Sequence, residues 1–387
     1  MKCILAITTI VALAAGACNK SINVKSQTDI NTINECEKFQ GNVVIDGIAG
    51  LDTISIDNLK QISGNIIIQN MYNLQTVSLG NLASANSLKI LNNTNVYKVD
   101  IPSLTKVSDF QVIVNPNLKE MNYKNISSVD NFQIINTYVS ELGAFTAPSV
   151  ENIEVLSNLQ LVKLDFSSVG KASGYINIAN NGKNANITFS SLTNVGGNAS
   201  FADAAALNIN KLSTIADDFS LYTNSFKNLT VGQLTEAQKS VTLSGNKFTS
   251  ISFPKLKDIG SSLNIANNTN FKSVDKNTFP ELTTIPGSII LVGSFDNITF
   301  PSLSTVDGLV SLSGKGRLSC EDAEDALSAA SNIDCELETI ADDSESDGDE
   351  EKASSSKSKS SKSAGVSHSV TFAAFFGGAV ALVAACL

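Results

Sequence analysis

The chain has 387 residues, of which 37 are acidic and 27 are basic, so its formal net charge at pH 7 is −10. This acidic balance argues against nucleic acid or an anionic lipid surface as a partner, because both repel a negatively charged protein. A single arginine, Arg317, leaves no cluster for bidentate recognition of phosphate.

Residues 1–17 have the layout of a secretory signal peptide. Lys2 supplies a positive start, an apolar stretch follows from Ile4 to Ala15, and the small residues Ala15-Gly16-Ala17 end the segment. The apolar run is too short to span a bilayer comfortably. We therefore expect cleavage near Ala17 and export of the mature chain into an oxidising compartment.

Residues 18–40 follow the signal and contain the first two cysteines of the mature chain. Once the termini are removed, four cysteines remain, which allow three connectivities. Because they form two local pairs at opposite ends, we expect the disulfides Cys18–Cys36 and Cys320–Cys335. Each would close a loop of about 15–20 residues and contribute on the order of 3 kcal/mol to stability.

Residues 41–316 contain an internal repeat with a period of about 22 residues. Its motif has an apolar residue at the first position, Leu or Val at the fourth, and Val or Ile at the seventh. The second position is often Pro. Clear copies occupy residues 101–107, 189–195, 253–259, 279–285 and 300–306. Each repeat also holds short alternating segments rich in Val and Ile, such as residues 110–114, which predict strands and not helices. The sequence therefore predicts an all-β fold, a parallel β-solenoid whose stacked coils share one core.

Asparagine recurs at the expected strand ends and turns, where it tolerates left-handed backbone. Inward-pointing members would form a stacked amide ladder. Several asparagines also lie in Asn-x-Ser/Thr sequons, which predict heavy N-glycosylation on exposed turns. The predicted acceptors are Asn92, Asn125, Asn186, Asn198, Asn228, Asn267 and Asn297; Asn19 also matches but lies very near the mature N-terminus. Asn92 and Asn267 present a conflict, because one side chain cannot be both buried in a ladder and glycosylated.

Residues 317–335 enclose a helix-prone, Ala-rich stretch between the second pair of cysteines. The open ends of stacked coils expose unpaired strand edges and core. We therefore interpret residues 18–40 and 317–335 as end caps fastened by their disulfides. Residues 336–363 are acidic and then rich in Ser and Lys, which predicts a disordered stalk.

Residues 364–387 predict a segment that is replaced by a glycosylphosphatidylinositol (GPI) anchor. Small residues, a polar spacer and a terminal apolar tail are typical of that signal. We expect attachment at Ser363, with Ser361 and Gly365 as alternatives. An ordinary tail-anchored helix is the competing interpretation, and the N-terminal signal together with the lack of basic residues beyond the tail disfavours it.

The expected mature chain is poor in catalytic side chains. The only histidine, His368, lies beyond the expected attachment site, and the sequence has no tryptophan. The usual general base, zinc ligand and thiol nucleophile would therefore be missing. We expect no enzyme activity, no cofactor and no metal. Asp203, Asp217 and Asp218 form the one carboxylate cluster worth testing for glycoside hydrolysis, and solvated turn aspartates are the simpler interpretation.

These features together resemble a known family. The signal, the capping segment that runs into Gly41-Asn-Val-Val-Ile45, the Phe-Pro-x-Leu-x-x-Ile repeats, the Asn-rich turns and the Ser-rich anchored tail resemble fungal GPI-anchored cell-wall organisation proteins. That family includes the yeast sporulation-specific wall proteins, and its repeats resemble receptor L domains. The resemblance covers essentially the whole chain and implies a right-handed β-helix with leucine-rich-repeat-like coils. The acidic run and the degenerate repeat at residues 199–206 depart from the pattern.

The resemblance implies a non-catalytic role in organising the vegetative or spore wall. The expected partners are wall glucan or wall proteins, and the expected location is the outer leaflet of the plasma membrane or the wall itself. The first alternative is a cell-surface receptor or adhesin, which an exposed apolar patch would favour. The second is a carbohydrate-active β-helix enzyme, which two facing carboxylates on adjacent coils would favour.

Overall fold

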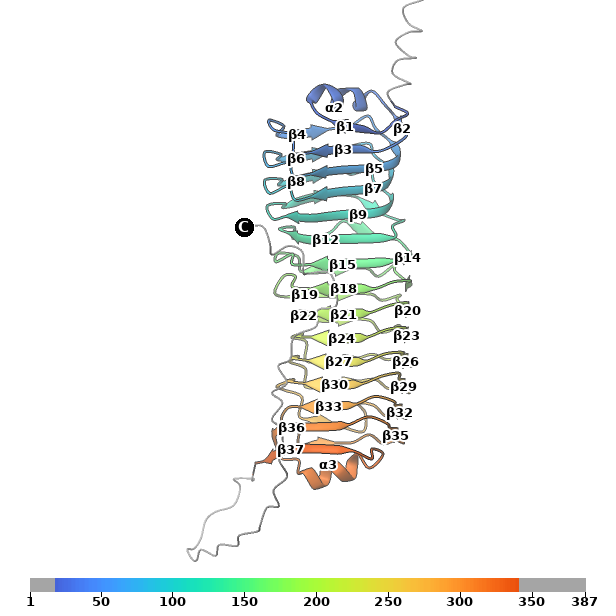
Figure 1. The fold of residues 1–387 in the computed structure, drawn as a ribbon, viewed down its shortest axis with the longest axis vertical. Helices are drawn as coiled ribbons and strands as arrows, with labels where there is room; N and C mark the ends of the chain where they lie inside the picture. The colour runs from blue at the N-terminus through green and yellow to red at the C-terminus, as the bar shows by residue number, and fades with distance from the viewer. Residues whose placement is uncertain (1–17, 341–387) are drawn as a thin grey trace, which may run out of the picture. The chain divides into compact units, whose positions relative to one another are not determined.

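A computed structural model describes residues 18–340 of the chain (Figure 1). The predicted signal peptide, the attachment segment with Ser361, Ser363, Gly365 and His368, and the predicted stalk beyond residue 340 lie outside the described residues. Within residues 18–340, no helix is long and apolar enough to cross a membrane.

The described residues form a parallel β-solenoid, which confirms the predicted fold class (Figure 1). Each coil contributes a strand to a 16-stranded sheet, called here the main face. Its strands, in spatial order, are β1 (Ile22–Val24), β3 (Val43–Asp46), β5 (Gln61–Gln69), β7 (Ser84–Leu91), β9 (Lys106–Asn115), β12 (Asn131–Thr137), β15 (Asn152–Leu156), β18 (Ile176–Ala179), β21 (Ala199–Ala202), β24 (Phe219–Tyr222), β27 (Val241–Ser244), β30 (Leu263–Ala266), β33 (Ile289–Val292), β36 (Val310–Gly316) and β37 (Ile333–Thr339), with β2 (Lys38–Phe39) beside β5.

Two further faces complete each coil. The second face consists of short sheets formed by β4 (Thr53–Ser55), β6 (Thr76–Ser78), β8 (Lys98–Asp100) and β10 (Glu120–Asn122); β11 (Asn125–Ile126) and β13 (Ala144–Phe145); β16 (Lys163–Asp165), β19 (Ala185–Thr188) and β22 (Ala204–Asn208); β25 (Asn228–Thr230) and β28 (Ser250–Ser252); and β31 (Ser273–Val274) and β34 (Asn297–Ile298). The third face is one sheet of β14 (Ser149–Val150), β17 (Lys171–Ala172), β20 (Asn194–Val195), β23 (Thr214–Ile215), β26 (Glu236–Ala237), β29 (Asp258–Ile259), β32 (Thr284–Ile285) and β35 (Thr305–Val306).

The repeat motif supplies the core. Its apolar positions are buried in the clear copies except at Leu303, which is partly buried in the last copy. Phe253, Leu256 and Ile259, for example, are fully inaccessible to solvent. The phenylalanines of successive coils stack, with ring centroids 5.2 Å apart between Phe253 and Phe279. Because each coil places its motif over the preceding one, the apolar surface of one coil is covered only by its neighbours. Stability therefore accumulates along the stack.

A buried amide ladder runs along the turn that follows the main face. Asn246 shows its pattern: Nδ2 donates to the Leu221 carbonyl at 2.9 Å and to Asn268 Oδ1 at 3.0 Å, while Oδ1 accepts from the backbone N–H and Nδ2 of Asn224. These bonds satisfy amides that would otherwise be orphaned in the core. The ladder members are Asn93, Asn115, Asn158, Asn181, Asn224, Asn246 and Asn268, and the ladder is interrupted at Thr137 and Ala204.

The corner between the third face and the main face differs along the chain. In the N-terminal coils one strand continues through the corner, so β5, β7 and β9 are 9, 8 and 10 residues long. Farther along, residues such as 196–198 separate the faces, and the main strands from β18 to β33 shorten to four residues. Gly196 is required there, because a Cβ would overlap the Ser173 carbonyl of the preceding coil.

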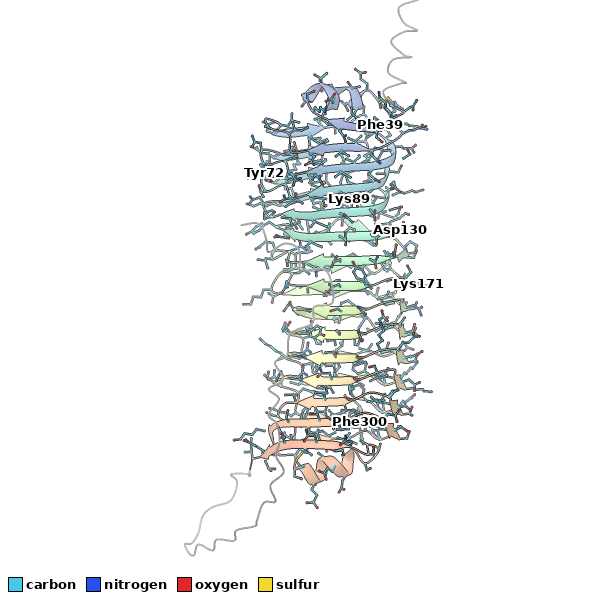
Figure 2. All side chains as sticks on the ribbon, viewed as in Figure 1. Phe39, Tyr72, Lys89, Asp130, Lys171 and Phe300 are labelled. Carbon is cyan, nitrogen blue, oxygen red and sulfur yellow. A yellow bond between two sulfur atoms is a disulfide. The ribbon has the colours of Figure 1, made fainter. Side chains whose placement is uncertain are left out.

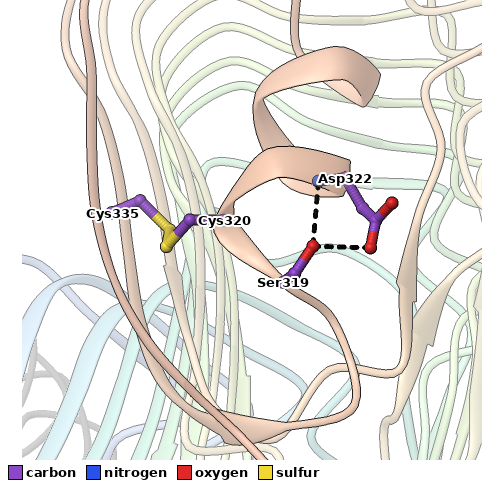
Figure 3. The surroundings of a disulfide bond; sticks show 4 residues. All are labelled: Ser319, Cys320, Asp322 and Cys335. Carbon is purple, nitrogen blue, oxygen red and sulfur yellow. Dashed lines mark hydrogen bonds between the residues drawn. A yellow bond between two sulfur atoms is a disulfide. The ribbon is translucent and has the colours of Figure 1, made fainter. Parts of the chain in front are cut away.

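Each end of the stack is closed by a helix and a disulfide. At the N-terminal end, α2 (Gln27–Asn34) buries Ile30 and Ile33, and Cys18 is bonded to Cys36. At the other end, Ser319 caps α3 (Cys320–Ala326) by accepting the Asp322 N–H at 3.1 Å, beside the Cys320–Cys335 disulfide (Figure 3). Both cystines join the cysteines that the sequence analysis pairs.

The sheet extends into segments that we expected to be cap and stalk. β1 lies within residues 18–40 and pairs with β3, and β37 continues past Cys335 to Thr339 while pairing with β36. Sequence periodicity misses these strands because each has one neighbour only, and neither carries the complete motif. The solenoid backbone is therefore longer than the repeat region.

Candidate functional site

One edge of the solenoid carries exposed aromatic and aliphatic side chains. This tyrosine edge comprises Tyr72, Tyr97, Tyr138, Leu159 and Val162, all in the turns that follow main-face strands in the N-terminal half. Tyr72 projects from it in Figure 2 and is 59% exposed, and Leu159 is 66% exposed. Equivalent positions on successive coils lie about 4.8 Å apart. The members follow β5, β7, β12 and β15, and the turn after β9 carries Lys119 between them.

The adjacent column of the main face extends this edge. Leu91, Ile113, Ile135 and Leu156 stand in direct register on β7, β9, β12 and β15, on the outward side, and each is half-buried. Clustered apolar surface of this kind is typical of an interaction site. The ammonium of Lys119 lies 5.6 Å from the centroid of the Tyr138 ring, which holds that ring in a cation–π contact.

Left-handed backbone recurs in the turn after the main face in both halves of the solenoid. The residue before each ladder position adopts left-handed backbone, and most coils use Asn, Ser, Asp, Thr or Gly there. Val114 has φ +56° at this position. A β-branched residue in this conformation is an outlier, and such outliers persist where the surroundings or function require the side chain.

A cleft of about 390 Å³ opens where the second face is interrupted. The four-stranded sheet ends at β10 and the next begins at β16, and only the short β11–β13 pair lies between them. The connection before β13 approaches so closely that a side chain at Gly143 would overlap Tyr123. The cleft is lined by Tyr123, Glu141, Leu142, Gly143, Ala144, Phe145, Lys163, Asp165, Phe166, Ser167 and Ser168.

The polar groups of the cleft are available to a ligand. Among the described residues, neither Glu141 nor Lys163 forms a salt bridge, and the Asp165 carboxylate accepts hydrogen bonds from the Ser167 backbone and hydroxyl. Tyr123 is 3% exposed, and its hydroxyl has no hydrogen-bond partner in the described part of the chain. Burial raises the pKa of this hydroxyl well above its usual value, and the nearby Gly143 backbone offsets only part of the effect.

The structure separates the carboxylates that the sequence analysis grouped. Asp203 follows β21, whereas Asp217 and Asp218 precede β24 at the opposite end of the adjacent strands. At about 3.3 Å per residue, the offset between Asp203 and Asp218 is roughly 16 Å, too far for a hydrolytic pair, which needs at most about 9.5 Å. Asp217 is paired with Lys239, and Asp203 accepts hydrogen bonds from the Asn180 N–H and the Thr223 hydroxyl. No group of three or more metal-ligating side chains occurs in residues 18–340.

The sequon asparagines differ in exposure. Six are exposed: Asn19 at the N-terminal end of the described residues, and Asn186, Asn198, Asn228, Asn267 and Asn297 in the C-terminal half. Asn92 and Asn125 are half-buried; Asn92 Nδ2 donates to Asn70 at 2.8 Å, and Asn125 Oδ1 accepts from Thr146. The conflict between ladder and sequon disappears, because the ladder uses the next residue in each case, Asn93 or Asn268.

Comparison with known proteins supports the resemblance. Residues 35–135 match the receptor L domain family. The chain is 26% identical to a cell surface GPI-anchored protein of Arthroderma benhamiae over 279 residues, which cover 72% of this chain and 71% of that protein. It is also 26% identical to sporulation-specific protein 2 of Saccharomyces cerevisiae over 162 residues, 42% of this chain and 32% of that protein. These matches support a fungal cell-surface protein.

Sequence reasoning missed the tyrosine edge and the cleft. The spacing of the repeat gave no signal for the cleft, because the step from β12 to β15 is 21 residues (Asn131 to Asn152), no longer than the steps before and after it. The exposed tyrosines carried no signal, because a tyrosine in a turn is equally compatible with a buried or an exposed ring.

Proposed function

We propose that the protein is a non-catalytic, N-glycosylated surface protein that organises the fungal cell wall, vegetative or spore. In this proposal the signal peptide exports the chain, a GPI anchor at Ser363 tethers it, and residues 341–363 act as a stalk. The solenoid then stands at the outer leaflet of the plasma membrane or in the wall, in contact with glucan or wall proteins. The observation that carries the proposal is the similarity to a cell surface GPI-anchored protein over 72% of the chain.

Cell fractionation tests this proposal. Cells that express the protein are treated with phosphatidylinositol-specific phospholipase C and then with glucanase. Release by the lipase supports retention of the anchor at the membrane, and release by glucanase alone supports transfer to the wall. Ser363→Leu together with Ser361→Leu and Gly365→Leu should reduce lipase release, because anchor attachment needs a small residue. Recovery as an integral membrane protein, or free in the medium, would contradict the proposal.

A surface receptor or adhesin is the second candidate, and the tyrosine edge favours it. Monomeric proteins seldom leave a contiguous apolar strip exposed without a partner. Replacing Tyr72, Tyr97 and Tyr138 by serine should abolish attachment of expressing cells to one another or to a surface if this candidate holds. Unchanged attachment, with normal amounts of protein at the surface, would exclude it.

A further inference from the structure

We infer that the cleft between β10 and β16 is a binding site for an uncharged saccharide. The inference deepens the proposed function, because it gives the solenoid a defined place to hold wall polysaccharide. The cleft volume of about 390 Å³ lies within the range of small-molecule sites. It lies where the second face is interrupted between β10 and β16.

The charge of the cleft excludes anionic ligands. Glu141 and Asp165 contribute two negative charges, and Lys163 contributes one positive charge. The net charge of −1 repels phosphates and uronates.

The remaining chemistry matches a sugar ring. A pyranose presents hydroxyls at its rim, each able to donate and accept, and apolar C–H groups on its faces. The cleft offers acceptors in Glu141 and Asp165, donors in Lys163, and a hydroxyl in Ser168. Phe145 and Leu142 supply the apolar surface on which a ring face can pack.

The orphaned hydroxyl of Tyr123 is an independent observation. A buried polar atom without a partner costs stability in the free protein. Tyr123 borders the cleft, and its hydroxyl oxygen finds no partner among the described residues. The hydroxyl itself is buried, so a ligand hydroxyl reaches it only where the wall of the cleft moves on binding. Such a contact would give Tyr123 a partner that the described residues do not supply.

The tyrosine edge gives a polymer its path away from the cleft. Tyr138 precedes Glu141 by one short turn, and Val162 directly precedes Lys163. A chain whose end occupies the cleft can therefore continue over Tyr138 and Tyr97 on preceding coils, with rings stacking on its sugar faces. An extended peptide fits less well, because β16 offers an edge of only three residues for backbone pairing.

Isothermal titration of the protein purified from expressing cells in detergent tests the site. The probes are hexamers of β-1,3-linked glucose, β-1,4-linked glucose and N-acetylglucosamine, with an oligogalacturonate as the anionic comparison. We expect at least one neutral hexamer to bind and the oligogalacturonate not to bind. Lys163→Gln should weaken binding about tenfold or more, since it removes a charged donor. The matched control, Lys171→Gln, changes an exposed lysine on the opposite side of the solenoid (Figure 2) and should leave affinity unchanged.

A second variant separates binding from folding. Tyr123→Phe should weaken binding about fivefold or more while the melting temperature stays equal or rises, because the orphaned hydroxyl is removed. Loss of both binding and stability would mean that the hydroxyl serves the fold, which overturns its assignment to the ligand.

Three outcomes would overturn the site itself: binding that is unaffected by either cleft variant, absence of binding to every neutral hexamer, or binding of extended peptides alone. Shortening of the hexamer during titration would show that the protein hydrolyses the saccharide, which would overturn the assignment of the cleft as a site for binding only. None of these outcomes depends on where the protein is found in cells, so they are distinct from failure of the proposed function.

Discussion

The N-terminal and C-terminal halves of the solenoid share one core and differ at their surfaces. Up to Val162 the turn after the main face exposes tyrosines and aliphatic residues. Beyond it, the surface carries five of the six exposed sequon asparagines, and the sixth is Asn19 at the N-terminal end of the described residues. The receptor L domain match, residues 35–135, falls in the first half. The difference teaches that a repeat fixes the interior of every coil while leaving the outward positions free to differ between the halves.

The backbone follows the same division. The long strands of the first half continue through the corner, whereas the second half turns it with separate residues such as Gly196 and Gly260, where a Cβ would overlap the preceding coil. The cleft lies at the junction, where the second face changes from one sheet to the next. The change of backbone and the hollow therefore occur in neighbouring coils.

The largest expected difference between the halves is in glycosylation. Glycopeptide mass spectrometry should find glycans on the five exposed sequons beyond Val162, and low occupancy at Asn92 and Asn125, whose amides are hydrogen-bonded and half-buried. Asn228→Gln should remove one glycan from the intact mass, whereas Asn92→Gln should remove little. Full occupancy of Asn92 would contradict the difference between the two halves, because a glycan would then lie on the tyrosine edge.

The next largest effect concerns the shared core. Asn93→Ala and Asn246→Ala should each lower the free energy of unfolding by about 3–5 kcal/mol, because several buried groups lose their partners at once. In a stack of coils the damage stays local. Hydrogen exchange should therefore increase around β7 in the first variant and around β27 in the second.

The matched control for the ladder is Asn270→Ala, which removes one exposed hydrogen bond to the Lys247 carbonyl. It should cost less than about 1 kcal/mol. Equal losses for Asn246→Ala and Asn270→Ala would show that burial of the ladder contributes nothing.

A smaller effect tests the strain in the tyrosine edge. Val114→Asn should raise the free energy of unfolding by about 1 kcal/mol, because asparagine tolerates the φ of +56° that valine resists. The reciprocal change, Asn136→Val, at φ +54° on the next coil, should lower it by a similar amount. Thermal or denaturant unfolding measures both. A loss of stability in Val114→Asn would show that the valine side chain is needed by the fold.

The smallest effect is a pH dependence confined to the first coils. Burial alone would raise the pKa of the Asp57 carboxyl, but hydrogen bonds from Ser55, Ser78 and the Gly80 amide outweigh it and hold the pKa below its usual value. Because the folded pKa is the lower one, this carboxylate stabilises the protein above about pH 4. The stabilisation is lost as pH falls through the folded pKa.

Asp57→Asn should therefore flatten the fall in melting temperature between about pH 4 and pH 2. The control, Asp52→Asn, changes an exposed carboxylate of the same coil. It should leave the fall in melting temperature at acid pH as steep as in the wild type. Identical acid limbs in the wild type and Asp57→Asn would contradict the assignment.

Much of the fold was predictable from the sequence. The motif with Phe253, Leu256 and Ile259 identified the buried positions, because apolar residues that recur once per coil are buried together in the shared core. The disulfides were predictable because the cysteines form local pairs. The amide ladder was predicted in kind but not in register: Asn92 and Asn93 are both asparagine, and only the backbone shows that the second points inward.

The candidate site was not predictable. Asp203 and Asp218 are close in sequence and on adjacent coils, yet a strand length separates them, since they lie at opposite strand ends. Glu141 and Lys163 are 22 residues apart and share a cleft. Sequence spacing gives the coil but not the position along the coil at which two side chains meet.

The sequence by itself determined the solenoid, its period, its core and its closed ends, because those follow from repeated apolar spacing and from local pairs of cysteines. The tertiary structure alone decided which outward residues form a surface. The tyrosine edge gathers side chains from turns about 20 residues or more apart, and the cleft exists because the second face breaks between two stacked strands. Both depend on how neighbouring coils lie on one another, which no single coil encodes.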